Sequence, residues 1–196
     1  MLKITGGEFR SRRLVGPPDE RVSRPYPQRV REAVFNMLRE WFDEARVLDL
    51  FAGIGTVGLE AISRGARHVM MVERDPKIFR LLCQNIQSLG CEERATALRA
   101  DALGATALAD APRPVDLVFF DPPYSMIEDE RQRPRVLQQM SRCREVMAAR
   151  SFLVLRSPVG ADEIDLTVEG LEGPEAHRYG KSMWVLLYQP SEQDRD

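Results

Sequence analysis

Three glycines have the spacing Gly53-x-Gly55-x-x-Gly58 after a short apolar run, and acidic Glu73 comes twenty residues after the first of them. Glycine lets the backbone turn sharply and approach a ligand closely. A carboxylate at the end of the next strand can accept hydrogen bonds from a ribose diol. This pattern is typical of sites for an adenosine-containing cofactor. It does not distinguish a nicotinamide or flavin dinucleotide from S-adenosylmethionine.

A second group of residues, Asp121-Pro122-Pro123-Tyr124, comes directly after the apolar run 115–120. An exocyclic or amide nitrogen is a weak nucleophile because its lone pair is delocalised into the adjacent π-system. The Asp121 carboxylate and the Pro122 carbonyl can accept its two hydrogens, so that the nitrogen pyramidalises toward a sulfonium methyl. The prolines stiffen the loop, and the Tyr124 ring offers a flat surface to a flipped base. The motif predicts methyl transfer to an amine nitrogen, whereas a stray copy in a surface loop would form only a turn.

Charge is distributed unevenly along the chain. Residues 1–31 contain eight Lys or Arg residues and three acids, a net charge of +5 in a chain whose net charge is -2. A basic segment on an acidic body indicates a local contact with a polyanion, although a solvated segment without a partner has the same composition. Arg29 and Arg31 lie near the start of an expected helix, where positive charge opposes the helix dipole. This position favours an anionic contact.

The elements that must position these residues follow from apolar periodicity and turn residues. A β-hairpin is expected over residues 1–15, with a tight turn at Gly6-Gly7. An amphipathic helix is expected over residues 27–42, with Pro27 in its first turn. After Ala45, short apolar runs alternate with helical stretches, which predicts βαβ units and a parallel sheet.

The expected strands are residues 46–50, 68–73, 95–100, 115–120, 151–156, 164–169 and 182–189. The expected helices between them are residues 56–64, 76–89, 102–109 and 128–149. Gly90 provides a stop signal for the second of these helices. The last two strands are expected to close the sheet with an antiparallel pair. The glycine loop and the Asp121 loop then lie at the carboxyl edge of one sheet.

The composition is that of an ordinary globular protein. Of 196 residues, 43% are hydrophobic and 30% are charged, which excludes collagenous, disordered and membrane classes. Apolar runs such as residues 183–188 are too short to span a bilayer, and the first residues lack the apolar stretch of a signal peptide. A cytoplasmic protein is therefore expected. The cysteines form no C-x-x-C pair and only two histidines are present, so no metal site is expected.

Together these residues resemble the class I S-adenosylmethionine-dependent amino-methyltransferases, and in particular the RsmD family. The resemblance covers nearly the whole chain and rests on Gly6-Gly7 with Arg10, Arg12 and Arg13, on Arg24-Pro25 with Arg29-Val30-Arg31-Glu32, on residues 49–60 and 121–124, and on Arg178-Tyr179-Gly180. It implies methylation of the N2 amine of a specific guanine in 16S rRNA, with S-adenosylmethionine as cofactor. The implied partner is the small ribosomal subunit, as an assembled or assembling 30S particle. One departure is Tyr26-Pro27-Gln28, where the family usually has Thr-Thr-Asp.

The resemblance also implies residue roles. The residues implied in catalysis are Asp121, Pro122, Pro123 and Tyr124. The residues implied in cofactor binding are Asp49, Phe51, Ala52, Gly53, Gly55, Gly58, Glu73, Arg74, Asp101 and Ala102. The residues implied in RNA binding are Arg10, Arg12, Arg13, Arg24, Arg29 and Arg31. From the residues alone, Asp101 is equally well explained as a helix N-cap, and Glu60 as a residue on a helix surface.

The expected fold is therefore α/β and Rossmann-like, with a seven-stranded, mostly parallel sheet that has one antiparallel strand and helices on both faces. An N-terminal β-hairpin and helix are added to it. Residues 1–44 are expected to form an rRNA-binding extension, residues 45–190 the methyltransferase domain, and residues 191–196 a disordered tail. The protein is expected to be a monomer.

Other functions share some of these features. An adenine-N6 DNA methyltransferase uses the same D-P-P-Y chemistry, although the chain leaves no room for a separate target-recognition domain. A protein-glutamine methyltransferase more often has Asn at the first position of the motif. A non-catalytic nucleotide- or RNA-binding module would not need Asp121 and Tyr124, and a dinucleotide oxidoreductase would not explain the motif.

Overall fold

The computed structural model describes residues 2–17 and 27–191. The strands are β1 (Arg46–Leu50), β2 (His68–Val72), β3 (Ala95–Leu98), β4 (Val115–Phe120), β5 (Met147–Ser157), β6 (Leu171–Arg178) and β7 (Trp184–Pro190). The helices are α1 (Gln28–Met37), the short 3-10 helix η2 (Arg39–Trp41), α2 (Gly58–Ser63), α3 (Pro76–Leu89), α4 (Thr106–Ala109), α5 (Tyr124–Glu128) and α6 (Arg133–Cys143).

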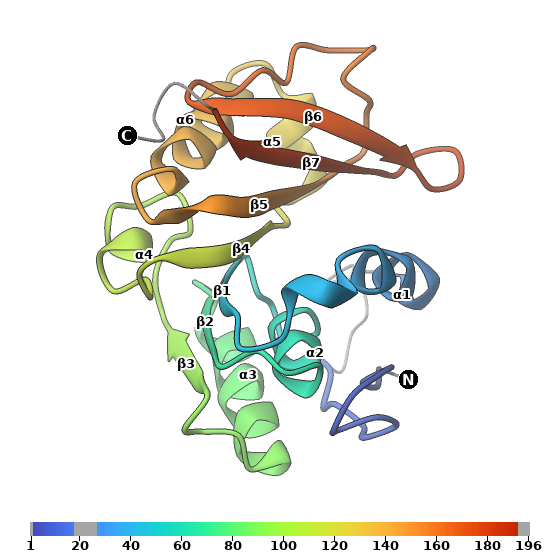
Figure 1. Ribbon diagram of the computed structural model, residues 1–196, viewed down its shortest axis with the longest axis vertical. Coiled ribbons are helices and arrows are strands. Elements are labelled where there is room, and N and C mark those ends of the chain that lie inside the picture. The colour runs from blue at the N-terminus through green and yellow to red at the C-terminus, as the bar shows by residue number, and fades with distance from the viewer. Residues whose placement is uncertain (1, 18–26, 192–196) are drawn as a thin grey trace.

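The seven strands form one sheet in the order β3-β2-β1-β4-β5-β7-β6, as Figure 1 shows. Neighbouring strands from β3 to β5 are parallel. Strand β7 runs antiparallel to both of its neighbours, β5 and β6. The Rossmann-like fold class is confirmed, including its single antiparallel strand.

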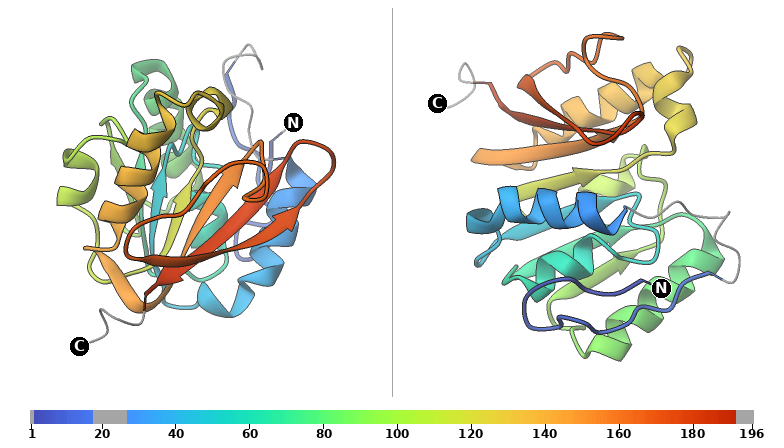
Figure 2. Two further views of the ribbon diagram at one scale, coloured as in Figure 1. Left: turned by 90° about the horizontal axis from the view of Figure 1, so that it is seen from above. Right: turned by 90° about the vertical axis from the view of Figure 1, so that its right-hand side faces the viewer.

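Alternate residues of the strands face two separate apolar layers. Phe119 of β4 and Val154 of β5 pack into a cluster with α1, α2 and α3. Their neighbours Phe120 and Leu155 pack into a second cluster with α4, α5 and α6. A strand covered on both faces needs apolar residues at successive positions, which explains the unbroken runs in the sequence. Figure 2 shows the helices on both sides of the sheet.

Local signals set the bounds of α3, which are the expected ones. The Asp75 side chain accepts hydrogen bonds from the N–H groups of Lys77 at 2.8 Å and Ile78 at 3.0 Å. Pro76 suits the first helical position because its missing N–H would have no partner there. Gly90 ends the helix with a φ of 67°, a left-handed conformation that costs glycine little.

The strand order reverses between β1 and β4. Leu50 and Phe120, the last residues of these two strands, are register partners. The Asp121 N–H donates to the Leu50 carbonyl at 3.3 Å, which continues the pairing one residue further. The loops after β1 and β4 therefore leave the sheet side by side. In sheets of this kind, ligands bind beyond the carboxyl ends of the strands at such a switch point.

The N-terminal segment pairs with itself, but without the expected tight turn at Gly6-Gly7. Leu14 N–H donates to the Leu2 carbonyl, which gives an antiparallel pair like that of a hairpin. The connection is longer because the chain between these residues packs on α2. Gly7 has a φ of 74°, and a Cβ on it would lie 1.7 Å from the carbonyl oxygen of Ser63. This glycine therefore serves close approach to a helix rather than a two-residue turn.

Two expectations for the C-terminal half are wrong. The stretch 128–149 is not one helix, because it contains the end of α5, all of α6 and the start of β5. Residues 164–169 form no strand. The Asp165 side chain accepts the Thr167 N–H at 2.9 Å, a local turn that competes with strand pairing, while Leu166 and Val168 are buried from the loop.

The strand that pairs with β7 at the edge of the sheet is β6, which begins two residues after the expected strand 164–169. Its sequence, LEGPEAHR, has few of the β-branched and aromatic residues that favour strands. As the edge strand of the sheet it leaves most of its residues exposed, and an edge position tolerates Pro174. Smaller differences concern three other elements. Strand β3 ends at Leu98, the expected helix 102–109 is confined to α4, and the first helix gives way to η2. Within the part of the chain that the structure describes, no helix has the length and apolar character needed to cross a membrane.

Candidate active site

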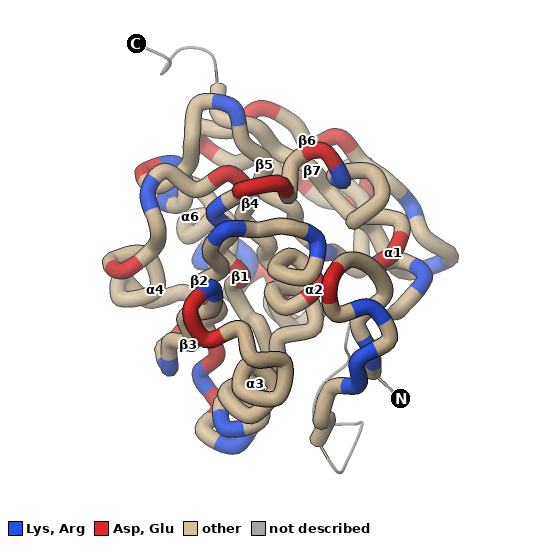
Figure 3. The backbone as a smooth tube through the Cα atoms, turned by 60° about the horizontal axis from the view of Figure 1, so that its bottom comes forward, with Lys and Arg blue, Asp and Glu red and all other residues tan. Residues whose placement is uncertain are grey.

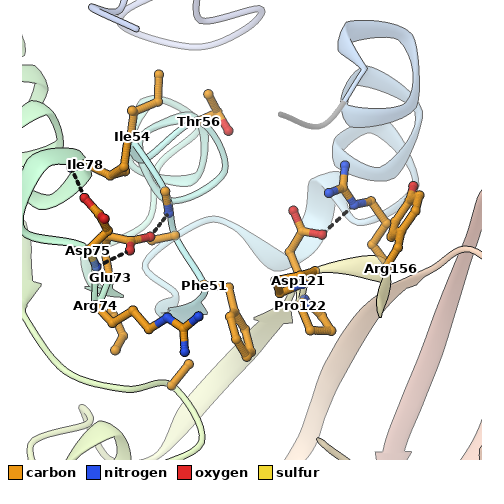
Figure 4. Close-up of a pocket in the computed structure, with 16 residues that line it drawn as sticks. Phe51, Ile54, Thr56, Glu73, Arg74, Asp75, Ile78, Asp121, Pro122 and Arg156 are labelled. Carbon is orange, nitrogen blue, oxygen red and sulfur yellow. Dashed lines mark hydrogen bonds and ion pairs between the residues drawn. The ribbon is translucent and has the colours of Figure 1, made fainter. Parts of the chain in front are cut away.

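A cavity of about 540 Å³ opens at the carboxyl edge of the sheet, beside the β1–β4 switch point. Its volume lies within the range of about 300–1,000 Å³ that is usual for small-molecule sites. The side chains around it are shown in Figure 4. The lining residues are Phe51, Ala52, Gly53, Ile54, Thr56, Val72, Glu73, Arg74, Asp75, Ile78, Ala102, Asp121, Pro122, Pro123, Tyr124 and Arg156. The fold thus brings together all four expected catalytic residues and six of the expected cofactor-binding residues.

Glu73 follows β2 and lies against the glycine loop. One carboxylate oxygen accepts the N–H of Gly53 at 3.1 Å, and the other accepts the N–H of Asp75 at 2.7 Å. An ionised carboxylate has about four acceptor positions, so both oxygens keep capacity for further donors. The chemistry of this group, at the rim of a cavity of suitable size, fits the two hydroxyls of a ribose.

The first residue of the loop after β1 is in an unusual conformation. Phe51 has a φ of 66°, which is rare for a bulky side chain, and its ring lies 5.4 Å from that of Phe120. Backbone strain of this kind persists where the surrounding structure holds it, and it is common at functional sites. The ring forms part of the cavity wall between Glu73 and Asp121, as Figure 4 shows.

Asp49, Gly55 and Gly58 do not line the cavity. They determine the conformation of the glycine loop through contacts on its other side. A Cβ on Gly55 would lie 2.7 Å from Leu82, and one on Gly58 would lie 2.5 Å from the Met71 sulfur. The buried Asp49 side chain accepts the Gly58 N–H at 2.9 Å. These residues let the loop pack closely on α3 and β2 and fasten it to β1.

Burial raises the pKa of Asp49 to about 8, and the negative charges of Asp121 and Glu73 add to this rise. The Gly58 N–H acts in the opposite direction, because it stabilises the ionised carboxylate.

Asp101 is also outside the cavity wall. It is exposed and accepts the Leu103 N–H at 3.1 Å, so it caps a turn that precedes α4, and its neighbour Ala102 lines the cavity instead.

Asp121 is held by a partner that the sequence analysis did not identify. Arg156 near the end of β5 donates from Nε to Asp121 Oδ1 at 2.5 Å, and its guanidinium carbon lies 5.3 Å from the centre of the Tyr124 ring. Burial raises the pKa of Asp121 to about 6, while the charge and the hydrogen bond of Arg156 oppose the rise. The sequence signal for this residue was an arginine directly after the apolar run 152–155 of β5, a strand that is parallel to the one before Asp121.

Other residues of the cavity wall were also missed. Ile54 and Thr56 occupy the variable positions of the glycine motif, and Ile78 is the first apolar residue of α3. Asp75 was identifiable as a residue of the site from its place two residues after Glu73. A motif marks the glycines and the acid, whereas the residues between them carry no pattern of their own.

Of the residues expected to bind RNA, Arg10, Arg12, Arg13 and Arg29 are exposed. Arg12 also donates to the Ser88 carbonyl at 2.7 Å. Lys and Arg positions can be followed along the tube near the N-terminus in Figure 3. Arg24 lies outside the described residues.

Arg31 is a correction to the expected RNA-binding set. Its side chain is only 2% exposed, and it donates to the Lys3 carbonyl, so it cannot reach a phosphate on the surface. Its Nε lies 3.7 Å from Glu60 Oε2. For Arg31, the anionic contact expected at the start of α1 is therefore the Glu60 carboxylate of the protein itself.

Glu60 is not a surface residue, because its side chain is fully buried. It accepts hydrogen bonds from the Thr5 N–H at 2.8 Å, the Thr5 hydroxyl at 2.7 Å and the Gly6 N–H at 2.9 Å. Arg64, one turn later, donates to it at 2.9 Å. This one carboxylate fastens the N-terminal segment to α2.

Among the residues described, no three His, Cys, Asp or Glu side chains gather in an arrangement that could hold a metal ion.

Known proteins resemble this chain in sequence and in structure. A family described as "Conserved hypothetical protein 95" matches residues 2–188. Ribosomal RNA small subunit methyltransferase D of Escherichia coli (strain K12) is 37% identical over 123 residues, which cover 63% of this chain and 60% of that protein. Putative rRNA methyltransferase YlbH of Bacillus subtilis (strain 168) is 41% identical over 104 residues, which cover 52% of this chain and 56% of that protein.

A solved structure described as the putative methyltransferase yhhF from Escherichia coli superposes with a TM-score of 0.79 at 28% identity. The superposition covers 97% of this chain and 98% of that chain. The sequence matches to the two curated relatives are shorter, since each spans less than two thirds of the relative's length.

Proposed function

The chain belongs to the Conserved hypothetical protein 95 family, which confirms the resemblance to the RsmD family, and on this basis we propose that it methylates rRNA. The proposed reaction transfers a methyl group from S-adenosylmethionine to the exocyclic N2 amine of one guanine in 16S rRNA. The observation that carries the proposal is the single cavity that joins the Glu73 loop to the D-P-P-Y loop.

The residues of the cavity fit the cofactor. The Glu73 carboxylate would hold the ribose hydroxyls, and the backbone of Ala52 and Gly53 would lie along the chain that joins ribose and methionine. Ala102 and Ile78 offer apolar contact for a purine ring. When bound, S-adenosylmethionine supplies an electrophilic methyl: the N–C bond forms as the C–S bond breaks with its electron pair going to sulfur, and the nitrogen then loses one proton.

The residues after β4 would orient the amine for this transfer. Asp121 and the Pro122 carbonyl accept its two hydrogens, so that its lone pair leaves conjugation with the ring and points toward the methyl group. Pro122 and Pro123 limit the rotation of the loop. The Tyr124 ring provides a stacking surface for a base that has left its helix. No strong base is needed, because the nitrogen becomes acidic once it is methylated.

The exposed arginines of the N-terminal segment would contact phosphates of the RNA. Arg10, Arg12 and Arg13 lie on a segment that Glu60 fastens to α2. Phosphate contacts of this kind orient an RNA without reading its sequence. A small protein of this kind would take its specificity from the shape of a small ribosomal subunit.

The proposal is tested by incubating the protein with methyl-labelled S-adenosylmethionine and one of four substrates: small ribosomal subunits, their protein-free RNA, short RNA oligonucleotides or DNA. The RNA is then digested to nucleosides, and the labelled product is identified by chromatography. We expect N2-methylguanosine at one site, with subunits preferred over short oligonucleotides. N6-methyladenosine, or label found only in DNA or protein, would contradict the proposal.

A further inference from the structure

Arg156 contacts both ends of the D-P-P-Y motif from a neighbouring strand. Its Nε lies 2.5 Å from Asp121 Oδ1, and its guanidinium carbon lies 5.3 Å from the centre of the Tyr124 ring. The side chains of Arg156 and Asp121 are 7% and 16% exposed, so the pair is largely shielded from water and salt. Figure 4 shows Arg156 pointing toward Asp121 at one end of the cavity, away from Glu73.

The register of the sheet fixes this arrangement. Phe120 and Leu155 are partners in the parallel pair of β4 and β5, and Asp121 and Arg156 are the next residues of each chain. Successive side chains of a strand point to opposite faces, so Asp121 and Arg156 lie on the same face as Phe119 and Val154. Arg156 is also paired with Val185 of β7, which places its backbone between two strands.

We propose that Arg156 is a positioning residue for methyl transfer, which fixes the rotation of the Asp121 carboxylate and the orientation of the Tyr124 ring. The inference rests on the proposed function. Among the described residues, the Arg156 Nε is the side-chain donor that engages Asp121, and it engages Oδ1. Oδ2 is then the oxygen that accepts the hydrogen of the amine. The planar guanidinium of Arg156 lies over the Tyr124 ring and restricts the rotation of that ring. The Asp121 carboxylate and the Tyr124 ring are therefore held in one relative orientation.

Arg156 also controls the charge of Asp121. Within residues 2–17 and 27–191, the charged groups that face Asp121 are Arg156 from β5 and Asp49 from β1, with Glu73 further along the same edge. Burial raises the pKa of Asp121 to about 6 even with Arg156 present. Without the arginine, the pKa would rise further and the carboxyl would be protonated at neutral pH. A protonated carboxyl carries a donor O–H and has lost part of its capacity to accept the hydrogens of an amine.

Three variants separate these effects. Arg156→Met keeps an unbranched apolar stem and removes the guanidinium, with its charge and its donors. Arg156→Lys keeps the charge and removes the planar fork. Arg94→Met is a matched control, because Arg94 also pairs with a carboxylate, Glu8, at 2.7 Å and lies 5.7 Å from the centre of an aromatic ring, that of Phe9. Unlike Arg156, Arg94 is not part of the cavity wall.

Each variant is examined by three measurements. Titration of the Asp121 carboxyl carbon by NMR, assigned with Asp121→Asn, is carried out on the ligand-free protein. The pH profile of methyl transfer to small subunits gives kcat and KM. Calorimetry gives the Kd of S-adenosylmethionine.

We expect Arg156→Met to raise the titration midpoint of Asp121 by about 1–3 pH units, the usual effect of losing an opposite charge at short range. The acidic limb of the kcat/KM profile moves up by the same amount, because this profile reports the pKa values of the free enzyme, while the Kd of S-adenosylmethionine is unchanged. In Arg156→Lys the titration midpoint of Asp121 should stay close to that of the parent. Its kcat should lie below the parent value at every pH, because lysine cannot fix both the Asp121 carboxylate and the Tyr124 ring. Arg94→Met moves neither the midpoint nor kcat.

An unchanged midpoint in Arg156→Met, or parent kcat in both Arg156 variants, would overturn the inference. If Arg156→Met does not fold, Arg156→Lys decides: a lower kcat with an unshifted midpoint supports positioning, and a parent kcat contradicts it. Failure of the proposed function gives a different result. In that case the parent transfers no methyl to RNA, while the NMR titration still measures the coupling of Arg156 to Asp121.

Discussion

The Glu73 carboxylate accepts the N–H of Gly53 at 3.1 Å, so the acid that follows β2 is joined directly to the glycine loop that follows β1. Its other oxygen accepts the N–H of Asp75, which caps α3. One side chain therefore holds three parts of the cavity wall in place: the glycine loop, the end of β2 and the start of α3. Any ribose bound here would meet a carboxylate whose position is already fixed.

Replacing Glu73 with alanine should weaken S-adenosylmethionine binding by about 1.5–3 kcal/mol, the range for charge-assisted hydrogen bonds. Glu73→Gln should lose less, because its amide oxygen can still accept from Gly53. Calorimetry on the folded variants measures both effects, and Glu92→Ala, an exposed acid beyond the end of α3, is the control. Undiminished affinity in Glu73→Ala would remove this residue from the binding site.

Asp121→Ala should abolish methyl transfer and leave the Kd of S-adenosylmethionine close to that of the parent. Asp121→Asn should keep part of the activity, because its carbonyl still accepts one hydrogen bond. In the parent, kcat/KM should fall as the pH is lowered through about 6, the pKa of Asp121, because protonation removes the acceptor. In Asp121→Asn this acidic limb should disappear. A fully active Asp121→Ala would refute the proposed orientation of the amine.

The exposed arginines of the N-terminal segment should determine the salt dependence of RNA binding. Each lost phosphate contact lowers the log–log slope by about 0.7–0.9, so replacing Arg10, Arg12 and Arg13 together with alanine should flatten it and weaken binding. Filter binding at a series of salt concentrations measures the slope. The control is Arg142→Ala with Arg150→Ala, two exposed arginines outside the segment. If the slope does not change, these arginines are a solvated surface without a partner.

Glu60→Ala should destabilise the protein by about 3–5 kcal/mol, because it leaves Arg31 and Arg64 without their buried partner. It also removes three hydrogen bonds to Thr5 and Gly6, so the N-terminal segment should become the first site of proteolytic cleavage. Urea unfolding and limited proteolysis give the two readouts, with Glu40→Ala as an exposed control. Parent-like resistance of the segment to protease would show that Glu60 does not anchor it.

Asp49 should make stability depend on pH. Its pKa is raised from 3.8 to about 8 in the folded protein, so the folded state holds a proton that the unfolded state releases. Stability from this group is therefore present at low pH and is lost as the pH rises from about 4 to 8. Asp49→Asn lacks this loss, and its stability relative to the parent should increase across that window and then level off. Urea unfolding at several pH values tests this, with exposed Asp110→Asn as a control that should show no such trend.

The sequence predicts best the parts of this protein that local signals determine. The bounds of α3 follow from Asp75, Pro76 and Gly90, and the strands of the parallel sheet follow from apolar runs that are buried on both faces. The glycine loop and the D-P-P-Y motif are likewise local, and adjacency of β1 and β4 brings them together. The roles that the residue types leave open are those that the resemblance to a family implies.

The parts that were missed depend on contacts between distant segments. Arg31 and Glu60 both have the sequence character of helix-surface residues, and only the packing of α1 and the N-terminal segment on α2 buries them. Strand β6 is recognisable only from its partner β7, because an edge strand needs no apolar alternation on its open face. Arg156 reaches the site through the register of two strands, which no single motif encodes.

The attachment of the N-terminal segment has a geometric consequence for a bound RNA. The segment is fastened to α2 by Glu60 and to α3 by Asn85, which bonds both the N–H and the carbonyl of Val15, whereas Asp121 follows the central strand β4. Because both places are attached to the same sheet and its helices, the fold sets the span between the arginines and the cavity. The protein would then select its target by distance. Only a nucleotide at one set distance along the RNA from the phosphates that the N-terminal arginines contact would reach Asp121. Lengthening the RNA between those two points by a single nucleotide would present a different base to the same pocket.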